Sequence, residues 1–131
     1  MRILIVDDEQ FSRVMLSDLL GEYGQCDMAA NGYEAIDAFM RARAEGAPYD
    51  LICLDIIMPE MDGQQVLKQI RSIEARDSVH GIDAVRVLVV SAMSDLEHIM
   101  MSFDSRYEAY MMKPVDRQQL VEHLALLGFN A

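Results

Sequence analysis

Basic residues are scarce in this chain of 131 residues. Eleven lysines and arginines stand against 22 aspartates and glutamates, which gives a formal net charge of −11. A surface of that sign repels phosphate backbones and anionic lipid headgroups. We therefore expect this chain to bind neither nucleic acid nor a membrane surface directly.

Long apolar runs and cysteines are also few. No apolar stretch approaches the roughly 20 residues that a membrane-spanning helix needs, and the run Ile3 to Val6 is too short for a signal peptide. A cytoplasmic protein is therefore expected. Cys26 and Cys53 lie in apolar, strand-like segments without neighbouring metal ligands, which predicts reduced core thiols rather than a disulfide or a zinc site.

Short apolar strands alternate with amphipathic helices along the chain. Strands are expected at residues 2–6, 25–30, 51–54, 85–90 and 108–112, with a helix after each. Asn31 and Asp62 are predicted to cap the second and third helices, and Gly24 to close the first. Residues 74–84 are expected to form a polar loop. This alternation predicts an α/β fold, a doubly wound parallel sheet of five strands with five helices, in a single domain spanning residues 1–131.

The third predicted strand ends in a carboxylate. Its four apolar residues, 51–54, are bounded by Asp50 and Asp55, a pattern typical of a strand covered on both faces in a parallel sheet. Asp55 should then lie at the carboxyl end of a central strand, where open α/β sheets bind ligands. Taken alone, this stretch leaves open whether Asp55 only caps the following turn.

Polar groups follow four of the five predicted strands. They are Asp7 and Asp8, Asp55, Ser91 and Lys113. Because the carboxyl ends of parallel strands share one edge, these groups should meet there. Three carboxylates repel one another unless a cation lies among them, and oxygen ligands without histidine or thiolate suit Mg2+. The ammonium group adds a second positive charge.

Such a site could accept a phosphoryl group, because carboxylates form acyl phosphates. No glycine-rich loop follows the first strand, which argues against a bound nucleotide or flavin. Asp55 is the expected nucleophile, since it alone stands at the centre of the predicted sheet.

Four motifs in order give the chain a family resemblance. They are Asp7-Asp8, the run from Leu54 to Gly63 (LDIIMPEMDG), Ser91-Ala92, and the run from Tyr110 to Pro114 (YMMKP). Together they make the chain resemble, over essentially its whole length, the receiver domain of two-component response regulators. The resemblance implies a flavodoxin-like sheet of strand order 2-1-3-4-5.

The resemblance also implies a phosphorylation site and a metal site. Asp55 would take a phosphoryl group from a phosphohistidine on a histidine kinase or a histidine phosphotransfer protein. Mg2+ would be bound by Asp8, by Asp55 and by the backbone carbonyl of Ile57, with Asp7 acting through water. The chain would assist its own phosphorylation and dephosphorylation without being a turnover enzyme.

Further implied roles concern the phosphoryl group and the signal. Ser91 and Lys113 would contact phosphoryl oxygens, and Ser91 and Tyr110 would form a switch, although a core role for Tyr110 stays open. A cis peptide bond is implied before Pro114. The output face would comprise helix 94–104, strand 108–112 and helix 115–127, where a downstream target, an output domain or a phosphorylation-dependent dimer partner would bind.

Two other functions would make different demands on the sequence. A Mg-dependent aspartate-nucleophile phosphatase would want a second acid two residues after Asp55, where this chain has Ile57. A degenerate receiver that signals by binding alone would not need the complete set of acids, serine and lysine. The sequence leaves open the cognate kinase, and whether this is a free-standing regulator or a piece of a longer protein.

Overall fold

A five-stranded parallel sheet forms the centre of the molecule. The computed structural model describes residues 1–79, 81–92 and 107–130. Its strands are β1 (Arg2–Val6), β2 (Gln25–Ala29), β3 (Leu51–Leu54), β4 (Arg86–Ala92) and β5 (Ala109–Lys113). They are arranged in the order β2-β1-β3-β4-β5, and every neighbouring pair is parallel. The implied strand order is confirmed.

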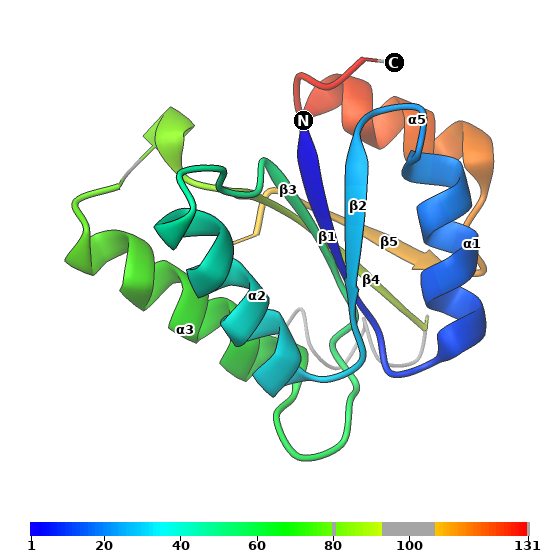
Figure 1. The fold of residues 1–131 in the computed structure, drawn as a ribbon. Coiled ribbons are helices and arrows are strands. Elements are labelled where there is room, and N and C mark those ends of the chain that lie inside the picture. The colour runs from blue at the N-terminus through cyan, green and yellow to red at the C-terminus, as the bar shows by residue number, and fades with distance from the viewer. Residues whose placement is uncertain (80, 93–106, 131) are drawn as a thin grey trace.

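Helices cover both faces of this sheet (Figure 1). The helices of the described residues are α1 (Gln10–Leu20), α2 (Gly32–Ala44), α3 (Gly63–Arg76) and α5 (Arg117–Leu126), with a 3-10 turn at Gly81–Asp83. Side chains of α2 and α3 pack with one face of the sheet in one apolar core, and side chains of α1 and α5 pack with the other face in a second core. The predicted helix 94–104 lies outside the described residues.

Two helices begin where the sequence predicts. The Asn31 side chain accepts a hydrogen bond from the backbone N–H of Glu34, and Asp62 forms a capping box with Gln65 at the start of α3. Each cap satisfies backbone N–H groups that would otherwise lack partners at a helix start. Neither Cys26 nor Cys53 forms a disulfide, as predicted.

The predicted end of the first helix is wrong. Helix α1 ends at Leu20, and Gly21 is its C-terminal cap residue. Gly24 has another reason to be glycine, because a Cβ atom there would lie 2.2 Å from the carbonyl oxygen of Met1. The neighbouring Gln25 donates its N–H to that same oxygen at 3.0 Å. Gly24 therefore permits the close approach that starts the pairing of β1 with β2.

The predicted polar loop at 74–84 is also partly wrong. Helix α3 continues to Arg76, and the side chain of Glu74 is buried at 2% exposure. Its carboxylate pairs with Arg71 at 2.8 Å and accepts the backbone N–H of Val85 at 2.7 Å. The polarity of Glu74 favours a loop, but its partners, which lie 3 and 11 residues away along the chain, hold it buried in the last turn of the helix.

Candidate phosphoacceptor site

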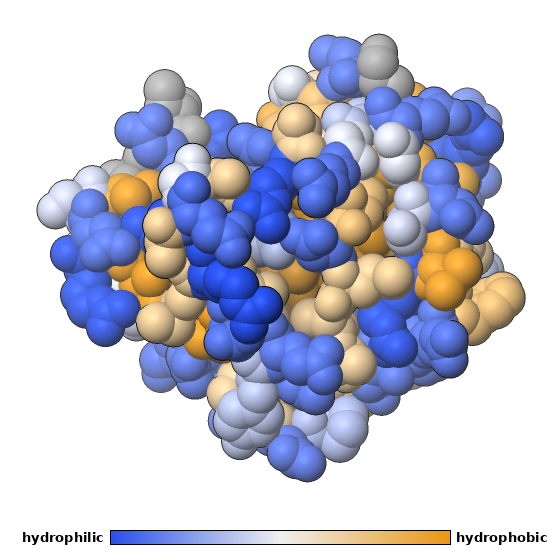
Figure 2. All heavy atoms as spheres, in the orientation of Figure 1, coloured by the Kyte–Doolittle hydropathy of each residue, from blue (hydrophilic) through white to orange (hydrophobic). Residues whose placement is uncertain are grey.

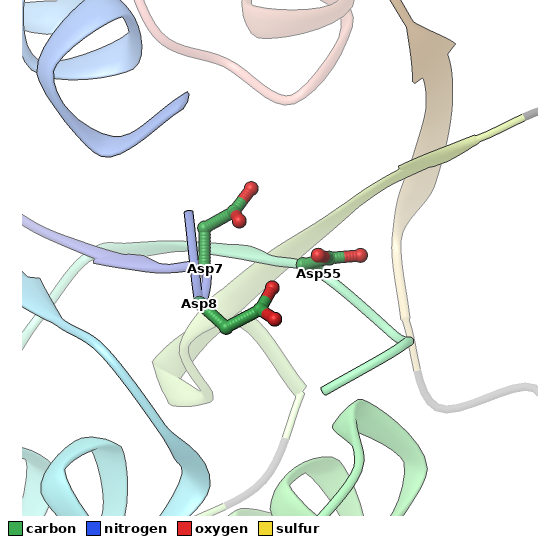
Figure 3. A group of neighbouring side chains, drawn as sticks. All are labelled: Asp7, Asp8 and Asp55. Atoms are coloured by element: carbon green, nitrogen blue, oxygen red, sulfur yellow. The ribbon is translucent and has the colours of Figure 1, made fainter. Parts of the chain in front are cut away.

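The carboxyl ends of β1 and β3 bring three carboxylates together. Val6 and Leu54 are paired as the last residues of these neighbouring strands, so the acids that follow them lie side by side. Oxygen atoms of Asp7, Asp8 and Asp55 all lie within 4.8 Å of one another (Figure 3). The Asp55 N–H donates to the carbonyl of Val6 at 2.9 Å, which ties the two strand ends together.

The start of α3 packs tightly behind Asp55. A Cβ atom at Gly63 would lie 2.5 Å from the carbonyl oxygen of Asp55 and 2.7 Å from the Cα of Ile56. Only glycine allows the helix to begin this close to the strand end. The backbone of Gly63 also donates to the carbonyl of Ile56 at 2.8 Å, which closes the loop that follows β3.

The three acids differ in burial and in partners. Asp7 is 1% exposed, and its two carboxylate oxygens accept hydrogen bonds from the Glu9 N–H at 2.9 Å and the Lys113 ammonium at 2.8 Å. Asp8 is exposed to solvent. Asp7 is thus engaged inside the protein, whereas Asp8 is open to a ligand from outside.

Lys113 neutralises part of this negative charge. Its Nζ lies 2.8 Å from Asp7 Oδ2 and 3.4 Å from Asp55 Oδ2. Burial acts to lower the pKa of Lys113, but its hydrogen bond to Asp7 and the charges of both carboxylates raise that pKa above its ordinary value. The amine is therefore held as an ammonium between the two buried acids.

Asp55 is the most crowded of the acids. Its Oδ1 accepts hydrogen bonds from the Ser91 hydroxyl at 3.2 Å and from the Ile57 N–H at 3.3 Å. Burial raises the pKa of the Asp55 carboxyl to about 6, with Lys113 opposing this rise and the charge of Asp7 adding to it. The folded protein therefore disfavours the ionised form of Asp55, and a cation beside the carboxylate would stabilise that form.

The structure brings most of the predicted residues together. Asp55 is contacted by Ser91, by Lys113 and by the backbone of Ile57, whose side chain is 52% exposed. The Lys113–Pro114 peptide bond is cis. Tyr110 lies apart on β5, where its side chain is 41% exposed and its ring meets that of Tyr107 edge to face at 6.3 Å between centroids.

Comparison with known proteins agrees with this geometry. The family model described as "Response regulator receiver domain" matches residues 3–125. The chain belongs to the response regulator receiver family. This receiver domain is 33% identical to chemotaxis protein CheY of Bacillus subtilis over 123 residues, which cover 92% of each chain. It is 31% identical to sporulation initiation phosphotransferase F of the same organism, covering 91% of this chain and 86% of that one.

A solved receiver structure has the same fold. Response regulator protein TrrA of Thermotoga maritima, in complex with Mg2+-BeF, superimposes with a TM-score of 0.74 at 31% identity, covering 96% of this receiver domain and 97% of that chain. The fold and the family together make the chain a phosphoaccepting receiver of the two-component type, and they do not favour a phosphatase or a receiver that acts by binding alone.

The acidic cluster of this receiver domain could hold a metal ion. Its donors are carboxylate oxygens alone, without histidine or thiolate among them. Such donors suit hard divalent cations, which bind oxygen in preference to nitrogen or sulfur. The exposed carboxylate of Asp8 is open to such an ion, which would also stabilise the ionised form of the buried Asp55.

Arg13 of the receiver domain is a further residue at this edge of the sheet that the strand pattern does not predict. Its guanidinium donates to the backbone carbonyl of Asp7 at 2.7 Å. A signal for it exists in the sequence, because Arg13 falls in the first turn of α1, where the helix dipole disfavours a positive charge. A cation placed there calls for a partner, and the backbone carbonyl of Asp7, six residues earlier, supplies one.

Proposed function

We propose that Asp55 is the phosphorylation site of this receiver and that its donor is a phosphohistidine on a histidine kinase or a histidine phosphotransfer protein. The contact set of Asp55 carries this proposal. Asp55 follows the central strand β3 and is 6% exposed, and both Ser91 and Lys113 contact its carboxylate. An acyl phosphate formed there would meet a hydroxyl donor and an ammonium without further rearrangement of the sheet.

The transfer step follows from these contacts. A carboxylate oxygen of Asp55 forms a bond to phosphorus as the bond from phosphorus to the donor's imidazole nitrogen breaks, and that nitrogen keeps the electron pair. Lys113 then pairs with a phosphoryl oxygen in place of Asp55 Oδ2. The Ser91 hydroxyl, which now donates to Asp55 Oδ1, turns its hydrogen bond to another phosphoryl oxygen.

Mg2+ is the proposed metal. Asp8, Asp55 and the backbone carbonyl of Ile57 would bind it directly and Asp7 through water, since both Asp7 oxygens already accept protein hydrogen bonds. The chemistry that this ion supplies when bound is neutralisation of charge on the phosphoryl oxygens. The Mg2+-BeF complex of TrrA, 31% identical, supports this choice.

Signalling would use Ser91 and Tyr110. As Ser91 moves toward the phosphoryl group it vacates space, and the half-exposed ring of Tyr110 turns inward.

The proposed output face is strand 108–112 with residues 94–104 and 115–127, of which 94–104 lie outside the described residues. A downstream target, an output domain or a second copy of the receiver would bind there. We place this receiver domain in the cytoplasm, where soluble kinase domains supply the phosphoryl group.

Labelling with radioactive acetyl phosphate tests the phosphorylation site. Wild-type protein with Mg2+ should take up label, and Asp55→Asn should take up none because the nucleophile is gone. Asp37→Asn is the matched control, since Asp37 is an exposed aspartate on α2. Chelation of Mg2+ by EDTA should abolish labelling of the wild type. Undiminished labelling of Asp55→Asn would refute the assignment.

A further inference from the structure

The peptide unit between Asp7 and Asp8 is held by Arg13. Arg13 Nη1 donates to the Asp7 carbonyl oxygen at 2.7 Å. Because a peptide unit is planar, a bond that fixes this carbonyl also fixes the Asp8 N–H and the direction in which the chain enters the Cα of Asp8. Helix α1 is anchored at the same place, since the Arg13 N–H donates to the Glu9 carbonyl at 3.1 Å.

The side chain of Asp8 has no such support of its own. Asp7 is fixed through both carboxylate oxygens, whereas within the described ranges the exposed Asp8 carboxylate makes no hydrogen bond or ion pair. Its position beside Asp55 therefore depends on the backbone that carries it. The bond from Arg13 constrains that backbone from the helix side.

We propose that Arg13 is a positioning residue for the metal, which fixes the Asp7–Asp8 peptide so that the Asp8 carboxylate is presented to the ion. This inference rests on the proposed function, because it assumes that Asp8 is a metal ligand. Residues that hold a ligand in place typically change metal affinity about 10- to 100-fold when they are removed. Arg13 would act entirely through Asp8 and would touch neither the metal nor the phosphoryl group.

Charge and positioning predict opposite results when Arg13 is removed. Loss of a guanidinium makes the site one unit more negative, which by Coulomb attraction alone would tighten the binding of a divalent cation. Loss of the hydrogen bond frees the Asp7–Asp8 peptide, which would weaken that binding. The sign of the change in Mg2+ affinity therefore decides between an electrostatic role and a positioning role.

The test is a Mg2+ titration of the unphosphorylated protein, followed by amide chemical shifts of residues 7, 8 and 57. Arg13→Met should bind Mg2+ about tenfold more weakly than wild type. Arg13→Lys, which keeps the charge and an N–H donor, should recover part of that loss. Arg41→Met should bind like wild type, because it makes the same charge change on the exposed face of α2.

Unchanged or tighter binding by Arg13→Met would overturn the inference, and so would Arg13→Lys binding no better than Arg13→Met. Urea unfolding without metal checks that each variant folds, and Arg13→Gln, whose shorter side chain falls short of the Asp7 carbonyl, replaces Arg13→Met if that variant does not. Failure of the wild type itself to bind Mg2+ would count against the proposed metal site and not against Arg13 alone.

Discussion

The surroundings of Asp55 favour its reaction at the expense of the stability of the folded protein. It is almost fully buried, it lies beside the carboxylate of Asp7, and its pKa is raised to about 6. The donors aimed at it, Ser91, Lys113 and the Ile57 N–H, oppose this rise but do not cancel it. Functional sites often reduce the stability of the protein that carries them, and here the cost falls on one ionised carboxylate.

Asp55→Asn should therefore stabilise the metal-free protein above about pH 6. The unfolded-state pKa of aspartate is about 3.9, so the raised pKa of Asp55 means that wild-type stability falls as pH rises through the window between about 4 and 6. The neutral amide does not carry this cost, and the gain is at most about 3 kcal/mol for a two-unit difference. Urea unfolding in EDTA, at pH values below and above that window, measures it.

The matched variant is again Asp37→Asn, on the exposed face of α2. It should show no gain that grows with pH. If Asp55→Asn were no more stable than wild type in EDTA at about pH 7.5, the inference that ionised Asp55 destabilises the fold would be wrong.

The strand pattern predicts the acids, serine and lysine of the site, but not the residues that hold the strand ends in place. Asp7, Asp8, Asp55, Ser91 and Lys113 each stand at or just after the end of an apolar strand, and parallel topology brings such positions to one edge. Arg13 and Glu74 act through contacts between a helix and a strand end. Such contacts depend on helix orientation and side-chain reach, which hydrophobic periodicity does not encode.

At the scale of elements, one network of ion pairs and hydrogen bonds joins α3 to the starts of β4 and β5. Arg71 on α3 pairs with Glu74 at 2.8 Å and with Glu108 at 3.1 Å, and it also donates to the Val85 carbonyl at 2.8 Å. Glu108, just before β5, accepts the N–H of Val87 at 2.6 Å. The network lies at the end of the sheet opposite Asp55. It therefore fixes the amino ends of the strands, whereas their carboxyl ends carry the site.

Glu74→Ala should destabilise the fold by about 2–4 kcal/mol, because it leaves the buried Val85 N–H without its acceptor and removes one partner of Arg71. Equilibrium unfolding in urea measures the change. Glu74→Gln, which keeps an acceptor for Val85, should cost less. Glu122→Ala, at an exposed position of α5, is the control and should change stability by no more than about 0.5 kcal/mol. Equal stability of Glu74→Ala and wild type would contradict a structural role for this network.

The elements themselves were largely predictable. Strand positions followed from apolar runs and two helix starts from Asn31 and Asp62, whereas the strand order came from the family resemblance and not from the pattern. The last turn of α3 was missed because Glu74 and Arg76 look like loop residues by polarity. An ion pair buried at the end of a helix does not change the spacing of the apolar residues, so hydrophobic periodicity does not reveal it.

At the scale of the whole molecule, the charge is strongly negative. The chain carries a net charge of −11, and the face seen in Figure 2 is covered mainly by hydrophilic residues with hydrophobic ones in smaller groups between them. No helix of the described part is both long and apolar enough to cross a bilayer. Such a field attracts Mg2+ and repels small anions, so Lys113 and the ion must offset that repulsion locally for a phosphoryl group to approach Asp55.

Mapping the phosphoryl group tests the central claim most directly. The protein would be phosphorylated with acetyl phosphate and Mg2+, reduced with borohydride, which converts an acyl phosphate into a stable alcohol, and digested for peptide mass spectrometry. We predict that the reduced residue is found at Asp55, in the peptide that carries Met58 and Pro59, and that it is absent when EDTA replaces Mg2+. Reduction at Asp7, Asp8 or Asp62 instead, or phosphate retained on a histidine, would contradict the account.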